Sequence, residues 1–111
     1  MVFMYEAKLK IILEAKNNVA AERVLAHLGD FLNLRVERMG KYHKGGFEIV
    51  ASISIASSIW SEAVYNIIQS AQQFGRSWVM TDEISERIDI TSNEFSVPGI
   101  EFVNITLDKN N

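Results

Sequence analysis

The sequence predicts an α+β fold in which an antiparallel sheet carries two helices packed on one face. Residues 3–13 and 47–55 alternate between apolar and mostly polar side chains, which is the period of a half-buried strand. Residues 18–32 and 60–71 instead repeat apolar side chains at helical spacing. The expected order is strand, helix, strand, strand, helix, and then two or three strands. This order favours a ferredoxin-like β-α-β-β-α-β architecture with an extra C-terminal strand or hairpin.

The first strand is expected over residues 3–13, and the first helix over about residues 18–32. Asn17 and Asn18 can accept hydrogen bonds from the free backbone N–H groups at the helix start. Gly29 lowers the helix propensity near the other end. The apolar face of the strand consists of Phe3, Tyr5, Ala7, Leu9, Ile11 and Leu13, and that of the helix of Val24, Leu25, Leu28, Phe31 and Leu32.

The middle of the chain predicts a β-hairpin. Its first strand begins at about Leu34, and its second occupies residues 47–55. Between them, residues 40–46 contain glycines that can adopt the positive φ of a tight turn. This segment lacks the residue order of a phosphate-binding loop and precedes a strand, where such a loop precedes a helix. A basic contact loop formed by residues 41–44 is the alternative interpretation.

The second helix is expected to begin at a serine pair and to end at a glycine. Ser57 and Ser58 offer an N-cap, with Glu62 near the position of a capping box. Gly75 is a natural C-cap. The helix places on one stripe Trp60, Ala63, Val64, Ile67, Ile68 and Ala71.

Short strands are expected after the second helix. They cover residues 77–81, 84–91 and 100–107, with a turn at Pro98-Gly99 before the last one. These strands would extend the sheet or add a hairpin. Because no linker or repeat interrupts the pattern, we expect residues 1–111 to form a single α+β domain.

The composition excludes several classes of function. A chain of 111 residues without cysteine cannot form disulfides, thiolate nucleophiles or most structural zinc sites. An isoelectric point near 5.3 argues against nucleic-acid binding. The N-terminal residues do not resemble a signal peptide, and no apolar run approaches the roughly 20 residues of a membrane span. We therefore expect a cytoplasmic protein that binds neither nucleic acid nor membranes directly.

The sequence contains no motif of catalysis or metal binding. His27 and His43 are its only histidines, and their spacing matches no zinc site. Ser57, Ser58 and Ser61 cluster where a helix begins, so capping explains them better than nucleophilic catalysis. We expect no enzymatic activity, no catalytic residue, no metal and no cofactor.

Charge is divided unevenly along the chain. Residues 1–81 carry nine Lys/Arg and seven Asp/Glu, whereas residues 82–111 carry seven Asp/Glu and two Lys/Arg. The net charges are therefore +2 and −5. The acidic part also contains strand-like apolar residues, so we expect folded strands that display carboxylates rather than a disordered tail.

Two interpretations of this acidic part remain open. It can be a solvated strand face that protects a sheet edge from aggregation, or a recognition surface for a basic partner. Trp78 can likewise be a core residue or an exposed contact anchor, since Trp is enriched in interface hot spots. The candidate partner-binding residues are Asp82, Glu83, Glu86, Asp89, Glu94, Glu101 and Trp78.

Part of the chain, roughly residues 47–107, resembles a protein family. Trp60, Gln72 and the segments 74–78 and 98–100 are similar in type and spacing to the α+β immunity proteins of bacterial contact-dependent growth inhibition systems. The resemblance implies tight binding of a cognate toxin, often a basic nuclease domain, by occlusion of its active site or substrate groove. It assigns no contact residues, which come from the charge pattern alone.

The alternative hypothesis is a ferredoxin-like small-ligand-binding or regulatory module. In that case residues 40–46 would carry the ligand contacts.

Overall fold

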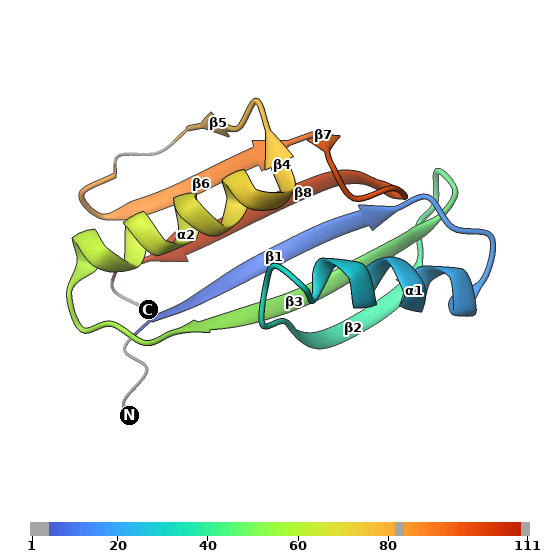
Figure 1. Cartoon of the computed structure of the whole chain (residues 1–111), viewed down its shortest axis with the longest axis horizontal. Helices are drawn as coiled ribbons and strands as arrows, with labels where there is room; N and C mark the ends of the chain where they lie inside the picture. The colour runs from blue at the N-terminus through green and yellow to red at the C-terminus, as the bar shows by residue number, and fades with distance from the viewer. Residues whose placement is uncertain (1–4, 82–83, 110–111) are drawn as a thin grey trace.

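Two helices and eight strands are formed by the residues that the structure describes, 5–81 and 84–109 (Figure 1). The structure is a computed structural model. Its helices are α1 (Asn18–Leu28) and α2 (Trp60–Phe74). Its strands are β1 (Tyr5–Leu13), β2 (Arg35–Lys41), β3 (Phe47–Ile55), β4 (Gly75–Arg76), β5 (Val79–Met80), β6 (Arg87–Ser92), β7 (Glu94–Phe95) and β8 (Ile100–Asp108).

Six of these strands form one antiparallel sheet in the order β2-β3-β1-β8-β6-β5. The strands β2, β3, β1 and β8 have the order of a ferredoxin-like sheet, with the last strand beside the first. The segment between α2 and β8 does two things. It extends the sheet outward through β6 and β5, and it adds a small hairpin of β4 and β7. The expected α+β fold is therefore confirmed.

Both helices lie on the same face of the sheet (Figure 1). The core between them is built from one side of each strand, as the period of two predicts. The strand residues of this core include Leu9, Ile11, Ile49, Ile88, Val103 and Ile105, and the helix residues include Ala21, Leu28, Ala63, Ile67 and Phe74. Within the described ranges, the opposite face of the sheet carries no helix.

The first helix begins as expected but ends earlier. The Asn17 side chain accepts a hydrogen bond from the Ala20 N–H at 2.9 Å, which confirms the N-cap. The helix ends at Leu28, where Gly29 is the C-cap, and not at about residue 32. Leu32 is nevertheless buried, because the turn that follows the helix directs it back into the core. The apolar spacing therefore predicted the burial of Leu32 correctly, although Leu32 lies outside the helix.

The expected N-cap of the second helix is wrong, whereas its expected C-cap, Gly75, is confirmed. The helix begins after Ile59, whose side chain forms no capping hydrogen bond. The Ser57 hydroxyl accepts a hydrogen bond from the Ile59 N–H at 3.2 Å and donates one to Glu62 Oε2 at 3.0 Å. These bonds brace the loop before the helix. Gly75 caps the other end of the helix, and its N–H donates to the Ala71 carbonyl. Its φ of −145° is an extended conformation that any residue can adopt.

Space, and not backbone freedom, explains the glycine at position 75. A Cβ atom there would lie 3.0 Å from ring atoms of both Phe95 and Trp78. The missing side chain therefore lets two aromatic rings approach the backbone closely.

The turns between strands are confirmed. Gly45 and Gly46 have positive φ in the β2–β3 hairpin, whereas Gly40 lies within β2. Gly99 also has a positive φ, in the turn before β8. In the part of the chain that the structure describes, neither helix has the length and apolar character needed to cross a membrane.

Candidate functional site

The candidate acidic residues do not form one continuous patch. Glu86 precedes β6 and its carbonyl accepts a hydrogen bond from the Lys109 N–H, whereas Glu101 lies at the other end of β8. At about 3.3 Å per residue, the strand between Lys109 and Glu101 separates the two ends by roughly 25 Å. Asp82 and Glu83 lie outside the described residues. A single acidic surface therefore does not include both Glu86 and Glu101.

Asp89 has a structural partner on the uncovered face of the sheet. Its Oδ1 accepts a hydrogen bond of 2.6 Å from Asn104 Nδ2, which also donates to Thr91 Oγ1 at 3.1 Å. These bonds join β6 to β8 through side chains. Asp89 is half-buried there, and its carboxylate already forms a hydrogen bond that stabilises the sheet. It is therefore less available to a partner than an exposed carboxylate.

Glu94 lies on β7 and contacts the segment that connects α2 to β5. Its Oε2 accepts a hydrogen bond from the Ser77 hydroxyl at 2.7 Å. Ser77 has φ +56°, which makes it the non-glycine residue with positive φ among those that the structure describes. The Ser92 hydroxyl also donates to the Arg76 carbonyl in this segment. These hydrogen bonds hold the strained backbone of Ser77, and this backbone conformation sets the direction of the chain at Trp78.

Trp78 is half-buried in an aromatic cluster. Its ring packs edge-on against Phe74 and Phe95, with centroid distances of 5.8 Å and 6.1 Å. Its Nε1 donates to the Ala71 carbonyl at 3.2 Å. The indole is thus fixed in orientation from two sides, and its N–H already has a partner.

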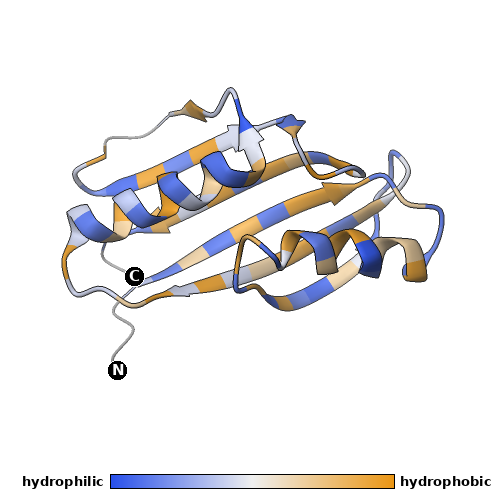
Figure 2. Cartoon of the chain, in the orientation of Figure 1, coloured by the Kyte–Doolittle hydropathy of each residue, from blue (hydrophilic) through white to orange (hydrophobic). Residues whose placement is uncertain are grey.

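Two exposed apolar side chains follow Trp78 on β5, the outermost strand of the sheet, and a third lies in the turn before β6. Val79 is 60% exposed, Met80 is 40% exposed and Ile84 is 49% exposed. Figure 2 shows the hydrophobic colour of β5 on the outermost strand of the sheet. We call Trp78, Val79 and Met80 the β5 edge. Ile84 lies in the turn before β6, where its carbonyl accepts a hydrogen bond from Trp60 Nε1 at 2.7 Å. Sequence reasoning named Trp78 as a possible contact anchor and predicted a short strand over residues 77–81, but it did not predict that this strand lies at the edge of the sheet.

Two hollows flank β5, one on each face of the sheet. The hollow on the helix-covered face measures about 150 Å³ and the hollow on the uncovered face about 300 Å³. The first is lined by Ile68, Ala71, Gln72, Trp78, Met80 and Ile90. The second is lined by Ser77, Val79, Thr91, Ser92, Asn93 and Phe102. Neighbouring residues of one short strand therefore line hollows on opposite faces.

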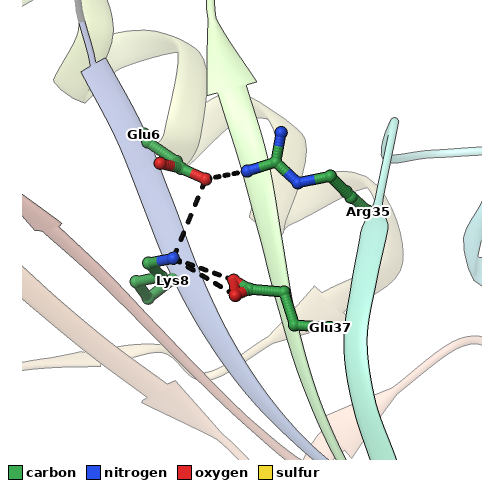
Figure 3. Close-up of polar contacts among 4 residues, drawn as sticks. All are labelled: Glu6, Lys8, Arg35 and Glu37. Atoms are coloured by element: carbon green, nitrogen blue, oxygen red, sulfur yellow. Dashed lines mark hydrogen bonds and ion pairs between the residues drawn. The ribbon is translucent and has the colours of Figure 1, made fainter.

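The opposite half of the uncovered face carries a charged cluster (Figure 3). Lys8 Nζ lies 2.8 Å from Glu37 and 3.7 Å from Glu6, and Arg35 pairs with Glu6. The hydrogen bond from Lys8 lowers the pKa of Glu37, and the same bond raises the pKa of Lys8. This cluster balances two cations against two carboxylates, so it presents no net charge to a partner.

Ser52 lies in the sheet beneath this cluster. Its side chain is fully buried although it points to the uncovered face. Its hydroxyl forms no hydrogen bond of normal geometry, and it is the weakest of the influences that lower the pKa of Glu37. The charged side chains above it thus act as its cover.

A third hollow lies among the loops at one end of the sheet. It measures about 530 Å³ and is open to solvent. Its lining residues include Glu14, Lys16, Lys44, Gly46 and Glu101, so both signs of charge are present. Within residues 5–81 and 84–109, no group of three His, Asp or Glu side chains is arranged to hold a metal ion.

Comparison with protein-family models identifies no family, and comparisons with curated proteins and with solved structures find no match.

Proposed function

We propose that the protein is an immunity-type inhibitor that binds a cognate toxin through the β5 edge. The observation that carries this proposal is the exposure of Val79 and Met80 on the outermost strand of the sheet, between two hollows. Interfaces between proteins typically combine an apolar centre with a polar, solvent-accessible rim. The β5 edge supplies such a centre.

Acidic residues near this edge favour a basic partner. Glu86 and Glu94 are exposed beyond the two opposite ends of β6, the strand that pairs with β5, and the sequence places Asp82 and Glu83 between β5 and β6. Residues 81–94 contain five acids and one base, Arg87. Such a charge excess accelerates encounter with a cationic protein, while buried apolar contacts supply most of the affinity.

The proposed mechanism is stoichiometric occlusion. A nuclease groove is basic because it must bind phosphates, so carboxylates on a tightly bound inhibitor can occupy the same positions. The inhibitor would need no chemistry of its own. It would need a rigid surface, which the hydrogen bonds of Ser77 and Trp78 provide.

The test is co-expression and co-purification with the C-terminal domain of the protein encoded by the upstream neighbouring reading frame. We expect that domain to be toxic alone, to be tolerated in the presence of this protein, and to form a one-to-one complex. A harmless or unbound neighbour would refute the proposal. A Val79→Asp/Met80→Asp double variant should fold, fail to protect, and thereby place the contact at the β5 edge.

A second candidate is a small-ligand-binding module. It is favoured by the loop hollow of about 530 Å³, in which Lys16 and Lys44 lie with Glu14 and Glu101. Such a mixture of charges suits a zwitterion such as an amino acid. A thermal-shift screen with amino acids and nucleotides would show a raised melting temperature if a ligand binds the native state.

A further inference from the structure

We infer that a hollow on the uncovered face of the sheet binds the guanidinium group of one arginine side chain of the toxin. This inference rests on the proposed function and names one contact of that interface. The hollow measures about 260 Å³ and is lined by Lys10, Ile12, Tyr42, Glu101 and Phe102. A cavity of about 150 Å³ can hold a benzene molecule, so this hollow has room for a planar guanidinium group and part of its stem.

A β-bulge in β8 brings Glu101 into this hollow beside Phe102. Phe102 pairs with Ile12 of β1, and the register then shifts. Leu13 pairs with Ile100, which leaves Glu101 without a partner residue in β1. In a regular strand, the neighbouring side chains of Glu101 and Phe102 would point to opposite faces, whereas a bulge can redirect a side chain. Both residues therefore line the same hollow.

Glu101 carries the uncompensated charge of this hollow. It is exposed and forms no ion pair with any residue that the structure describes. Lys10, the cation in the lining, already pairs with Glu48 Oε2 at 3.5 Å. Glu101 also lines the loop hollow, where Lys16 and Lys44 form no ion pair with it either. The hollow and its ion pair therefore keep one negative charge, which favours a monovalent cation.

The aromatic side chains of the hollow favour arginine over lysine. Tyr42 and Phe102 are half-buried, so each keeps part of its ring accessible. The Tyr42 ring is supported by His43, with centroids 4.5 Å apart, and Ile12 between the walls is only 5% exposed. A guanidinium group can stack on an aromatic ring and form paired hydrogen bonds with a carboxylate, whereas an ammonium group is a compact point charge. Two rings beside one unpaired carboxylate therefore suit a guanidinium group.

This hollow continues toward the β5 edge. Phe102 also lines the hollow of about 300 Å³ that Val79 lines on the same face. The strands β5, β6, β8 and β1 are neighbours in that order. At about 4.8 Å between strands, the hollow over β8 and β1 lies roughly 10–15 Å from β5. A standard interface covers about 800 Å² of each partner, so one toxin surface can reach both places.

The test compares Glu101→Gln with Glu14→Gln in binding to the purified toxin domain encoded upstream. Glu14 is an exposed carboxylate at the same end of the sheet, and it lines the loop hollow but not this one. We expect Glu101→Gln to weaken binding about tenfold and Glu14→Gln to bind within about twofold of the wild type. The loss should lie in faster dissociation, because a contact formed after encounter changes the association rate little.

The aromatic contact is tested at Tyr42. Tyr42→Leu should weaken binding about three- to fivefold, whereas Tyr42→Phe keeps the ring and should bind within about twofold of the wild type. Thermal melts establish that each variant folds. In NMR titrations of the protein alone, N-acetyl-arginine-N-methylamide should shift the ring signals of Tyr42 and Phe102. The matched norleucine derivative, which has no charge, should not shift them, and Glu101→Gln should abolish the response to the arginine derivative.

The outcomes separate this inference from the proposed function. Unweakened toxin binding by folded Glu101→Gln, or an equal loss in Glu14→Gln, would overturn the guanidinium site and leave the proposed function intact. Ring signals that respond equally to the arginine and norleucine derivatives would do the same. Failure of the wild-type protein to bind the toxin domain would overturn both.

Discussion

Lys8 and Glu37 form an ion pair of 2.8 Å across two strands that are not neighbours. Lys8 lies on β1 and Glu37 on β2, and β3 runs between them (Figure 3). The side chains therefore meet above Ser52, a β3 residue that they help to bury. A bulge in β2 between Val36 and Arg38 places the Glu37 carboxylate within reach of Lys8.

This pair predicts a pH dependence of stability. The pKa of Glu37 is lowered by the Lys8 hydrogen bond, so its contribution is present above its ordinary value of 4.5 and is lost as pH falls through the lowered pKa. The pKa of Lys8 is raised, so its contribution is present below 10.5 and is lost as pH rises through the raised pKa. Urea unfolding of Glu37→Gln should show a smaller deficit against the wild type at acid pH than at pH 7.

Salt provides the control for this pair. Both groups face solvent, so added salt should reduce the difference between Glu37→Gln and the wild type at pH 7. A deficit that does not depend on either pH or salt would mean that packing over Ser52, and not charge, accounts for the effect.

Gly46 should be intolerant of any side chain. Its φ is +80°, and a Cβ atom would lie 2.0 Å from the Leu13 carbonyl oxygen. Gly46→Ala should therefore lower the free energy of unfolding by about 2–4 kcal/mol in denaturant titration. Gly45 is the matched control, because its φ is +99° and a Cβ atom there would meet nothing within 4 Å. Gly45→Ala should cost only about 1 kcal/mol, and equal losses would show that clash is unimportant.

Phe74 should be the most sensitive residue of the aromatic cluster. It is fully buried and packs against Phe31, Trp78 and Phe95. Phe74→Ala should destabilise the protein by about 3–5 kcal/mol, because it removes a large buried side chain and leaves a cavity. Tyr65 on the same helix is 55% exposed, and Tyr65→Ala should change stability by no more than about 0.5 kcal/mol. Thermal or denaturant unfolding would measure both variants.

The position of the acids predicts which of them accelerate toxin binding. A charge-reversed variant at Asp82, Glu83 and Glu86 should reduce the association rate severalfold at low salt, with little change in the dissociation rate. Glu101→Lys should have a smaller effect, since Glu101 lies on β8, which β6 separates from β5, and at the opposite end of the sheet from Glu86. Stopped-flow kinetics at two salt concentrations would separate the variants. A larger effect of Glu101 would move the interface to the loop end of the sheet.

Most of the fold was predictable because its elements have strong local periods. The alternation in β1 and β3 and the apolar stripe of α2 each identify their buried face without reference to the rest of the chain. The ends of elements were harder to predict. Serine is a typical N-cap residue, but the hydrogen bonds of Ser57 stabilise the loop before α2 and do not cap the helix.

The candidate site was predictable only in part. The sequence indicated that Trp78 and the acids after it are unusual, and it placed Val79 and Ile84 in two predicted strands. The structure puts Val79 on the exposed edge strand β5 and Ile84 in the turn before β6. Ile12 is a case in which the alternation predicted exposure and the structure shows burial. It lies on the predicted polar face of β1, yet it is only 5% exposed beside its cross-strand partner Phe102.

By itself, the sequence determined the elements and the sign of the charge in each part of the chain, because periodicity and composition are local properties. The tertiary structure alone decided that β8 lies beside β1 and that β5 is the outermost strand. Strand order depends on contacts between residues far apart in the chain, which no local pattern encodes. That order left Met80 exposed at an edge, brought Trp78 against Phe95, and separated Glu86 from Glu101.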